Sequence, residues 1–408
     1  MSRPTARFYG FGGAALLLYS FANQTQVGWL YVLVALMFDI LVVAYGLNRG
    51  ALGGSVAARD LSTDADGELY EEDAIIVTLR LANLKRLPRY QLQLVETCPL
   101  AALSDREQRV FIPVLAAQSG LNFSYAVTLA RRGVYQFPAI QMQSRVPFGF
   151  FQRQTVLDVP TRALVYPVVR PLARFALLDK QLAAQQVHPQ AGVGTEVIGT
   201  RPYRPGDSPR HIHWRSVART GVLISKEFAQ ETQPGVSLVF DRYFPHANDD
   251  PHTPFEWGVK CAVSIAEYTQ RRGYPLYLNA DQSDLPTPSG ALAWEALLQY
   301  LARVTPTAIP MLPSLLTATS ALQSLVVVII AQPDAQSIAP LMALAQRGYR
   351  VVPVLLDPPS FPSASGGAPA QTIVDALASV DIASLMIRYG EDWAVQLAQI
   401  GQPDRITR

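Results

Sequence analysis

Residues Gly199 to Phe228 read Gly-Thr-Arg-Pro-Tyr-Arg-Pro-Gly-Asp-Ser-Pro-Arg-His-Ile-His-Trp-Arg-Ser-Val-Ala-Arg-Thr-Gly-Val-Leu-Ile-Ser-Lys-Glu-Phe. Nowhere else in the chain do arginine, tryptophan, tyrosine, glycine and proline lie so close together. Before Glu227 this segment contains one carboxylate, Asp207, and five arginines: Arg201, Arg204, Arg210, Arg215 and Arg219. Such an excess of guanidinium groups indicates either a rigid structural element or a surface that binds an acidic partner.

Local signals in this segment predict a turn, a short helix and a strand. Pro205-Gly206 suits a turn, because proline fixes φ at one central position and glycine tolerates positive φ at the next. Asp207 or Ser208 is placed to cap a short helix, and Gly221 is a signal for its end. The alternating residues from Val222 to Phe228 then predict a strand.

The order of these residues resembles the signature of the domain-of-unknown-function 58 family of bacterial and archaeal proteins. That signature is roughly Arg-x-Tyr-x-x-Gly-Asp-x-x-Arg-x-Ile-x-Trp-x-x-x-Ala-Arg-x-Gly-x-Leu, followed by a Glu and an apolar strand that ends in Asp. The matching positions are Arg201, Tyr203, Gly206, Asp207, Arg210, Ile212, Trp214, Ala218, Arg219, Gly221, Leu223, Glu227 and Asp241. The resemblance implies an architecture more directly than an activity. Together with Arg204, the signature residues are candidates for binding a partner or for holding the fold.

Composition bounds the class of protein. The chain has 408 residues, which is enough for two or three domains. Its net charge of +2 creates no overall field for nucleic acid, and its charged content of only 16% indicates that part of the chain lies in lipid. Two cysteines, Cys98 and Cys261, fall in different predicted domains. This spacing argues against a disulfide framework or a zinc cluster and fits a reducing compartment.

The first 50 residues predict a transmembrane hairpin. Phe8–Phe21 is apolar and uncharged, and Val27–Leu47 is apolar apart from Asp39, with roughly the twenty residues that cross a bilayer. A polar stretch, residues 23–26, separates the two spans. A cleaved signal peptide is the alternative, but no small-residue cleavage site follows the first span. Basic residues on both outer flanks place the soluble domains in the cytoplasm, namely Arg3, Arg7, Arg49 and Arg59.

Asp39 lies near the middle of the second span. An acidic residue inside a membrane suggests a function by default. The alternative is a protonated or hydrogen-bonded carboxyl packed against the partner helix, with Tyr19 or Asn23 as its neighbour. Because the spans contain no second acid, we expect the packing role.

Residues 51–170 predict an antiparallel β-sandwich. Short alternating stretches are separated by proline, glycine, asparagine and aspartate turns. The expected strands are residues 74–83, 90–96, 109–114, 122–129 and 140–145. This region clusters no nucleophile or metal ligands, so we interpret it as a spacer or interaction module. Residues 131–135 and 147–151 resemble elements that precede the signature in the same family. We expect the aromatic residues of 147–151 to staple the β domain to its neighbour rather than to form an exposed patch.

The signature segment, residues 171–235, leads into a predicted α/β domain at residues 236–408. Apolar strands alternate with amphipathic helices, which predicts a doubly wound sheet. The family resemblance implies a von Willebrand factor type A-like domain. In that fold the first strand ends in Asp-x-Ser-x-Ser, whose oxygens hold a divalent cation. Here both serines are missing from Asp241-Arg242-Tyr243-Phe244-Pro245, so Asp241 is a weak metal candidate and we expect no bound metal.

Other combinations of reactive residues are less specific. A loop with His246, Asp249, Asp250 and His252 matches no standard zinc spacing. His211 and His213 would lie on different faces of a helix, and the serines near them occupy no recognisable nucleophile turn, namely Ser208, Ser216 and Ser225. Phosphate-binding, dinucleotide and kinase motifs are absent from the sequence. We therefore expect no catalytic residues and no cofactor.

Three interpretations of the arginine cluster remain open. In the first it is structural, with Trp214 filling a core gap and Asp207 paired with Arg210 or Arg219. In the second it docks an acidic partner, and in the third it binds a phosphate at a helix N-terminus. No residue in the segment supplies a base or nucleophile for the third.

These observations favour a membrane-anchored, non-enzymatic scaffold or adaptor that does not bind nucleic acid. The resemblance implies a partnership with a MoxR-type AAA+ ATPase and its client proteins. A divalent-metal-dependent binding module through Asp241 is the first alternative. A hydrolase that uses the histidine-rich loops is the second.

Overall fold

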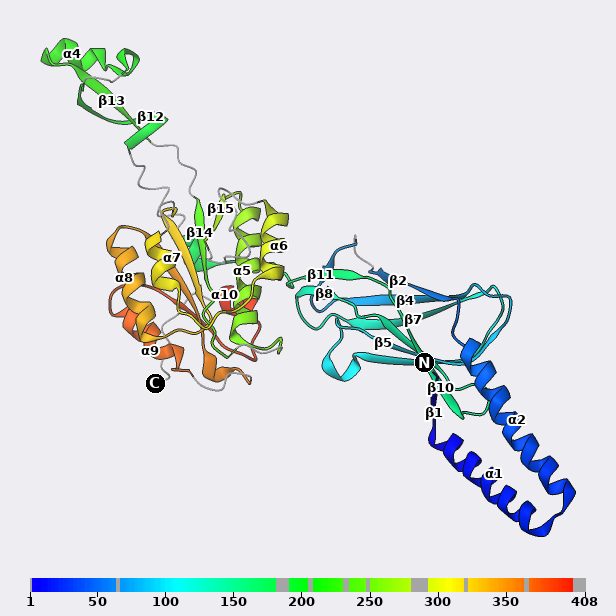
Figure 1. The fold of residues 1–408 in the computed structure, drawn as a ribbon. Coiled ribbons are helices and arrows are strands. Elements are labelled where there is room, and N and C mark those ends of the chain that lie inside the picture. The colour runs from blue at the N-terminus through cyan, green and yellow to red at the C-terminus, as the bar shows by residue number, and fades with distance from the viewer. Residues whose placement is uncertain are drawn as a thin grey trace. The chain divides into compact units, whose positions relative to one another are not determined.

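The computed structural model describes residues 2–63, 67–180, 191–204, 208–229, 235–246, 250–279, 293–318, 322–362 and 367–398. The chain forms two compact units, Met1–Tyr166 and Pro167–Arg408 (Figure 1). The first unit joins two helices to antiparallel β-sheets, and the second is built on a parallel sheet flanked by helices.

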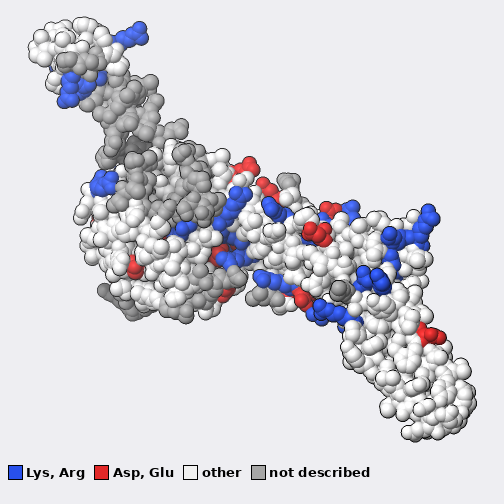
Figure 2. All heavy atoms as spheres, viewed as in Figure 1, with Lys and Arg blue, Asp and Glu red and all other residues white. Residues whose placement is uncertain are grey.

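Two apolar helices begin the first unit. They are α1 (Ala6–Thr25) and α2 (Gly28–Gly50), joined at Gln26 in the left-handed conformation. They pack through small or apolar side chains, including Ala15, Ala22 and Val34. Many of their other large side chains are exposed, and Figure 2 shows an almost wholly uncharged surface over the pair. A soluble protein rarely exposes so much apolar surface, so these helices suit a lipid environment.

Among the described residues, α2 is the helix that is long and apolar enough to cross a membrane, by length and composition. The neighbouring α1 is less apolar than α2, so the transmembrane hairpin stays a prediction. Asp39 is exposed on α2, while Tyr19 makes an edge-to-face contact with Tyr31 at 6.2 Å. Asn23 Oδ1 lies 3.5 Å from the Tyr31 hydroxyl. The expectation that Asp39 packs against Tyr19 or Asn23 is wrong, because those side chains face Tyr31 instead.

The β-domain of the first unit contains three sheets. Pairing is antiparallel except between β3 and β11, and the strand orders are β1-β10-β9-β5-β6, β2-β4-β7 and β3-β11-β8. The strands are β1 (Ser2–Pro4), β2 (Ser55–Ser62), β3 (Leu69–Tyr70), β4 (Ala74–Asn83), β5 (Arg89–Thr97), β6 (Glu107–Leu115), β7 (Gly120–Thr128), β8 (Gly133–Gln136), β9 (Ile140–Ser144), β10 (Phe151–Leu157) and β11 (Arg162–Tyr166). The predicted antiparallel strands are thus confirmed.

Alternation along the strands creates the core of this domain. In β4, Leu79 and Leu81 are buried, and they pack in one cluster with Leu92 and Leu94 of β5. Because every second side chain of a strand points to the same face, these residues line the inner faces of two different sheets. The two sheets enclose a shared hydrophobic layer.

The turn at residues 145–151 joins the helices to the sheets. Phe150 contacts Phe11 with ring centroids 4.8 Å apart, and Phe151 contacts Phe8 at 5.1 Å. Both Phe150 and Phe151 are buried, whereas Phe148 is exposed. The predicted aromatic staple therefore exists, and the neighbour that it holds is the helical pair.

A buried ion pair crosses the β-domain. The Nε and Nη2 atoms of Arg59 donate to the two carboxylate oxygens of Glu96 at 2.8 and 3.0 Å, and both side chains have zero exposed surface. Arg59 also donates to the carbonyls of Pro138 and Val159, and its guanidinium lies 4.4 Å from the Phe137 ring centroid. Burial raises the pKa of Glu96, and the Arg59 guanidinium acts in the opposite direction. Removing either charge would leave the other buried without compensation.

The second unit contains a five-stranded, wholly parallel sheet in the order β15-β14-β16-β17-β18. Its strands are β14 (Val236–Asp241), β15 (Leu276–Asn279), β16 (Leu325–Ile330), β17 (Arg350–Leu356) and β18 (Leu385–Ile387). Every residue of β14 and β16 is buried, as expected for continuous apolar strands. The helices are α5 (Pro254–Arg271), α6 (Trp294–Arg303), α7 (Leu312–Ala318), α8 (Ile338–Gln346), α9 (Ala370–Ala378) and α10 (Trp393–Ala398).

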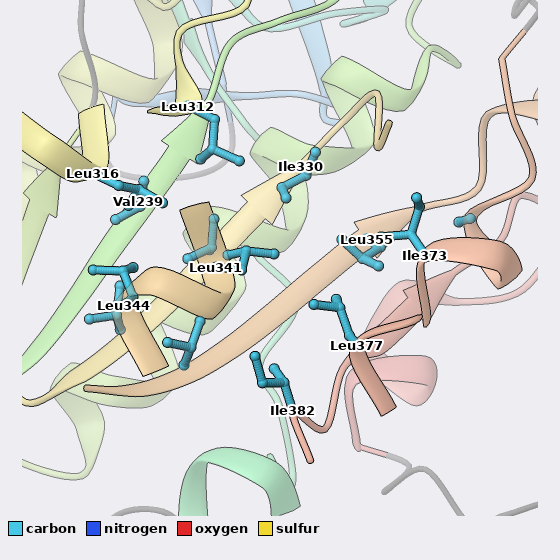
Figure 3. Packing of buried hydrophobic residues seen from close by; sticks show 14 residues of the cluster. Val239, Leu312, Leu316, Ile330, Leu341, Leu344, Leu355, Ile373, Leu377 and Ile382 are labelled. Carbon is cyan, nitrogen blue, oxygen red and sulfur yellow. The ribbon is translucent and has the colours of Figure 1, made fainter. Parts of the chain in front are cut away.

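Helices cover both faces of this sheet. On one face, α7, α8 and α9 contribute Leu316, Leu344 and Leu377 to a cluster with Val239 of β14 (Figure 3). On the other face, α5 lies so close that a Cβ on Gly258 would stand 3.3 Å from the Phe240 ring. The predicted parallel alternation of strands and helices is therefore present in this unit.

Prediction for the buried ion pair. We expect Glu96→Gln to lower the free energy of unfolding by about 3–5 kcal/mol, because the Arg59 charge stays buried without its partner. The exposed pair between Arg80 and Asp60 is a matched control, with 60% and 62% of its side chains exposed. Asp60→Asn should cost less than about 1 kcal/mol. Denaturant unfolding of the full chain in detergent measures both, and equal effects would contradict the role assigned to burial.

Candidate functional site

The signature segment forms a separate two-stranded arm, defined here as residues 191–229. Its strands β12 (Ala191–Pro202) and β13 (Ile224–Ala229) pair in antiparallel fashion, and the segment between them carries η2 (Pro209–His211) and α4 (Trp214–Thr220). The backbone N–H of Tyr203 donates to Leu223 at 3.0 Å, and that of His213 donates to Ile224 at 2.9 Å. These bonds fold the intervening segment back against β13.

The expected single helix is divided into two short elements. Ile212 adopts an extended conformation and forms a bridge with Ser225, which interrupts the helical path between η2 and α4. Ser208 precedes η2 without a side-chain capping bond, so the predicted cap is wrong for Ser208. The predicted helix end is confirmed, since Gly221 has φ of 70° and its N–H donates to Val217. A residue with a Cβ would be strained in that left-handed conformation.

Among the arm residues whose side chains the structure describes, Ile212 and Ser225 are buried. Arg201 and Tyr203 are half-buried, and the Arg201 guanidinium donates to the Pro202 carbonyl at 3.2 Å. Several side chains of this segment are exposed, namely Arg204, Arg210, Trp214, Arg215, Ala218 and Arg219. Glu227 lies in β13 opposite Gly199.

Trp214 exposes 64% of its surface, so the expectation that it fills a core gap is wrong. Val222 and Leu223 beside the helix end are also exposed, at 58% and 45%. In the described residues of the arm, the two strands form a single layer, and no second layer covers the indole. Gly206 and Asp207 lie outside the described residues, and so does the expected pairing of Asp207 with Arg210 or Arg219.

Within the described part of the chain, no carboxylate forms an ion pair with Arg210, Arg215 or Arg219. Figure 2 shows basic side chains among uncharged ones on the part of the arm that is drawn in colour. Exposed arginines beside an exposed tryptophan are the residue types most enriched where proteins bind one another.

Two histidines of the arm occupy separate elements. His211 ends η2, whereas His213 precedes α4 and its Nδ1 lies 2.6 Å from the Ser216 hydroxyl. A serine and a histidine need an acid on the other imidazole nitrogen to form a catalytic triad. No described residue of the arm provides a carboxylate at that position, so the contact serves to close the first turn of α4.

The parallel sheet provides a second candidate site at the carboxyl ends of its strands. The strand order reverses at β14, which has β15 on one side and β16 on the other. Ligands of open α/β sheets bind in the crevice at such a reversal. Asp241 ends β14 and Asp334 follows β16, so two carboxylates flank this point.

Asp241 is 3% exposed, and its Oδ1 accepts the backbone N–H of Tyr243 at 3.1 Å. Burial raises the pKa of Asp241 to about 6, with a contribution from Asp334 and opposing ones from Tyr243 and Arg242. Asp334 is itself engaged: its Oδ1 accepts the N–H and the hydroxyl of Ser337 at 2.9 and 2.8 Å. Among the residues that the structure describes, no three His, Cys, Asp or Glu side chains lie close enough together to hold a metal.

The side chains of His246, Asp250 and His252, in the loop after β14, contact different neighbours. His246 contacts the Phe244 ring, and His252 contacts the Tyr389 ring. Asp250 accepts the N–H of His252, and Asp249 lies outside the described residues. These side chains face different neighbours.

Sequence reasoning identified Asp241 but missed Asp334 and Ser337. The Asp-x-x-Ser spacing of these two residues is the signal of a capping box, and it lies shortly after β16. The sequence also gave no indication of the role of Asn48, whose buried carboxamide donates to three carbonyl groups of the β-domain. A polar residue near the end of an apolar helix gave no sequence cue to those partners.

Comparison with known proteins confirms the family resemblance. Residues 199–359 match the family described as "Protein of unknown function DUF58". The uncharacterized protein YeaD of Bacillus subtilis is 23% identical over 195 residues, so the chain spans 45% of the length of this relative.

Two solved structures are similar to parts of the chain. The CARDB domain of a Pyrococcus furiosus protein is 8% identical with a TM-score of 0.19, covering 28% of this chain and 94% of that domain. A β-N-acetylglucosaminidase of Vibrio harveyi is 10% identical with a TM-score of 0.22, covering 83% and 61%. At these scores neither likeness bears on the fold or the function.

Prediction for Asp241. Because the pKa of about 6 in the folded chain exceeds the value of 3.8 expected when unfolded, the native state binds the extra proton. Stability from this group is therefore present at low pH and lost as pH rises through 6. We expect Asp241→Asn to stabilise the second unit by up to about 3 kcal/mol at pH 8 and by little at pH 4. Thermal unfolding of the full chain at both pH values measures this difference, and an equal shift at both would contradict it.

Proposed function

Residues 199–359 carry the DUF58 match, and on that premise we propose that the chain is a membrane-anchored scaffold that presents its second unit to cytoplasmic partner proteins. One observation carries the proposal: the arm exposes Trp214 beside Arg210, Arg215 and Arg219, for which the described residues supply no carboxylate. The proposed role is non-enzymatic: the arm binds a partner through charge and an aromatic anchor.

The anchor is the helical pair, and both helices cross the membrane. The exposed apolar side chains of α1 and α2 support this, as does the length of α2. Arg3, Arg7 and Arg49 flank the pair and favour a cytoplasmic position for both of its ends. Arg59 does not contribute to that flank, because Glu96 neutralises it inside the β-domain. Asp39, exposed on α2, is available to a polar group of a partner helix.

The second unit is a degenerate von Willebrand factor type A-like domain. The five-stranded parallel sheet supports this assignment, as does the position of Asp241 at the end of its first strand. Recognition then takes place through the arm. The resemblance to the family suggests a MoxR-type AAA+ ATPase, with its clients, as the partner whose acidic surface the arm binds.

The geometry makes the expected binding dependent on charge. Guanidinium groups exposed to water steer an acidic partner and are screened by salt, while a tryptophan supplies the buried contact area. The affinity should therefore fall as ionic strength rises. It should also depend on the indole at any salt concentration.

Prediction for partner binding. We expect the full chain to bind the MoxR-type ATPase encoded nearest to it, and Trp214→Ala to weaken binding by about tenfold or more. The triple change of Arg210, Arg215 and Arg219 to Gln should weaken binding and remove most of its salt dependence. The measurement is a pull-down followed by binding isotherms at two salt concentrations.

The controls are Arg174→Gln and Arg303→Gln, which remove exposed arginines of the same unit outside the arm. Neither should change the affinity. An unchanged affinity in the arm variants, or equal losses in the controls, would contradict the proposal. So would the absence of any complex with or without nucleotide.

A second candidate is a divalent-metal-dependent binding module. The observation that favours it is the pair of carboxylates, Asp241 and Asp334, at the reversal of strand order. Oxygen ligands are those that Mg²⁺ prefers, although two carboxylates leave most of its coordination to water or to a partner.

Prediction for the metal alternative. A metal-binding module should release or absorb measurable heat when the full chain is titrated with Mg²⁺, and Asp241→Ala should abolish that heat. Asp250→Ala is the control, because this exposed-loop carboxylate is bonded within its own turn. Absence of heat from the wild-type chain would eliminate this candidate and leave the scaffold proposal intact.

A further inference from the structure

A cationic cavity lies where the first helix meets the β-domain. It encloses about 450 Å³ and is lined by Arg3, Pro4, Thr5, Ala6, Arg7, Arg145, Gly149, Gln152 and Gln154. Arg3, Arg7 and Arg145 are exposed, and within the described residues no carboxylate pairs with them. Three guanidinium groups and two carboxamides in one hollow match the oxygens of a phosphate group.

The turn beneath this cavity holds the arginines in place. Gly149 has φ of 75°, and a Cβ at this position would stand 3.1 Å from Nη1 of Arg7. Glycine thus permits both the turn and the close approach of the guanidinium. The first turn of α1 contains no acidic residue, so the positive end of the helix adds to the arginines instead of offsetting them.

An apolar groove continues from the cationic cavity along the helices. It encloses about 570 Å³, and its lining residues are Phe8, Tyr9, Gly12, Gly13, Leu16, Phe38, Leu41, Val42, Tyr45 and Phe151. The two hollows adjoin on α1, where Arg7 lines the first and Phe8 the second. They also adjoin on β10, at Phe151 and Gln152. A Cβ on Gly12 or Gly13 would meet no atom within 4 Å, so the missing side chains leave this groove open.

We propose that these two hollows form one binding site for an anionic phospholipid, with the headgroup phosphate on Arg3, Arg7 and Arg145 and an acyl chain along Gly12 and Gly13. The site rests on the membrane insertion of the helical pair in the proposed function. An anionic phospholipid has a charged headgroup joined to apolar acyl chains, and these parts match the cationic cavity and the apolar groove that continues from it. In a bilayer, the root of the helices lies at headgroup level, and each basic residue there attracts anionic lipid.

A soluble phosphate would use the cationic cavity alone, whereas a partner helix would use the groove alone. The lipid uses both, which is why variants in each half distinguish the occupants. The lining residues of the site all belong to the first unit, whereas the arm residues that carry the partner proposal belong to the second. Failure of one proposal therefore leaves a different signature from failure of the other.

Prediction for lipid binding. Native mass spectrometry of the delipidated full chain in detergent should show phosphatidylglycerol bound about tenfold more tightly than phosphatidylcholine. Changing Arg3, Arg7 and Arg145 to Gln should remove this preference but keep a residual affinity common to both lipids. Gly13→Leu should weaken the binding of both lipids, because the added side chain fills the groove.

Matched controls are Arg162→Gln, at an exposed arginine on β11, and Gly46→Leu, at a glycine of α2 that does not line the groove. Both should bind lipid as the wild type does, and thermal unfolding verifies that each variant is folded. Equal affinity of the wild type for the two lipids would overturn the proposal. So would a preference that survives the triple change, or displacement of the lipid by glycerol phosphate at the same concentration.

Discussion

The first unit depends on a single turn that fastens both ends of the helical pair. Asn48, at the end of α2, is fully buried and donates to the carbonyls of Val146 and Phe151 at 3.2 and 3.1 Å. Thr5, at the start of α1, donates its hydroxyl to Gly149 at 2.6 Å and its N–H to Phe150 at 2.9 Å. A buried amide without such acceptors would destabilise the fold, so these bonds fix the separation of the helix ends. The cationic cavity and the apolar groove both exist because that separation is fixed.

Arginine has three different environments in this chain, and each environment determines what the side chain can do. Arg59 is enclosed, satisfied by a carboxylate and carbonyls, and therefore structural. Arg7 lies in an open cavity without a carboxylate, and Arg215 lies on the exposed face of a short helix. The buried guanidinium of Arg59 is held by its partners inside the chain and cannot bind another molecule. Arg7 and Arg215 keep hydrogen-bond donors for molecules outside the chain. Arginine is thus structural in the core and available for binding at the two proposed contact surfaces.

The sequence allowed the strands and helices to be predicted well, because burial follows periodicity. Alternation located β4 and β7, and continuous apolar runs located β14 and β16. Long-range placement was less predictable. The exposure of Trp214 follows from the single layer that the described residues of the arm form, which no local pattern reveals. Asp39 was assigned to the interface between the helices, yet the rotation of α2 leaves it exposed. Cavities are the least accessible to sequence reasoning, since Arg145 and Arg7 are far apart in the chain and meet only through the turn.

Asp241 is a buried carboxylate at the end of β14. Tyr243 and Pro245 stand where the Asp-x-Ser-x-Ser pattern would have its serines. Burial of the Asp241 carboxylate costs stability at neutral pH, so packing alone would favour an asparagine of the same shape. The carboxylate nevertheless accepts the Tyr243 N–H and thereby shapes the loop that leaves β14. Since an amide oxygen could accept the same bond, the hydrogen bond does not account for the charge. The charge lies at the reversal of the strand order, next to Asp334, which already accepts hydrogen bonds from the N–H and the hydroxyl of Ser337.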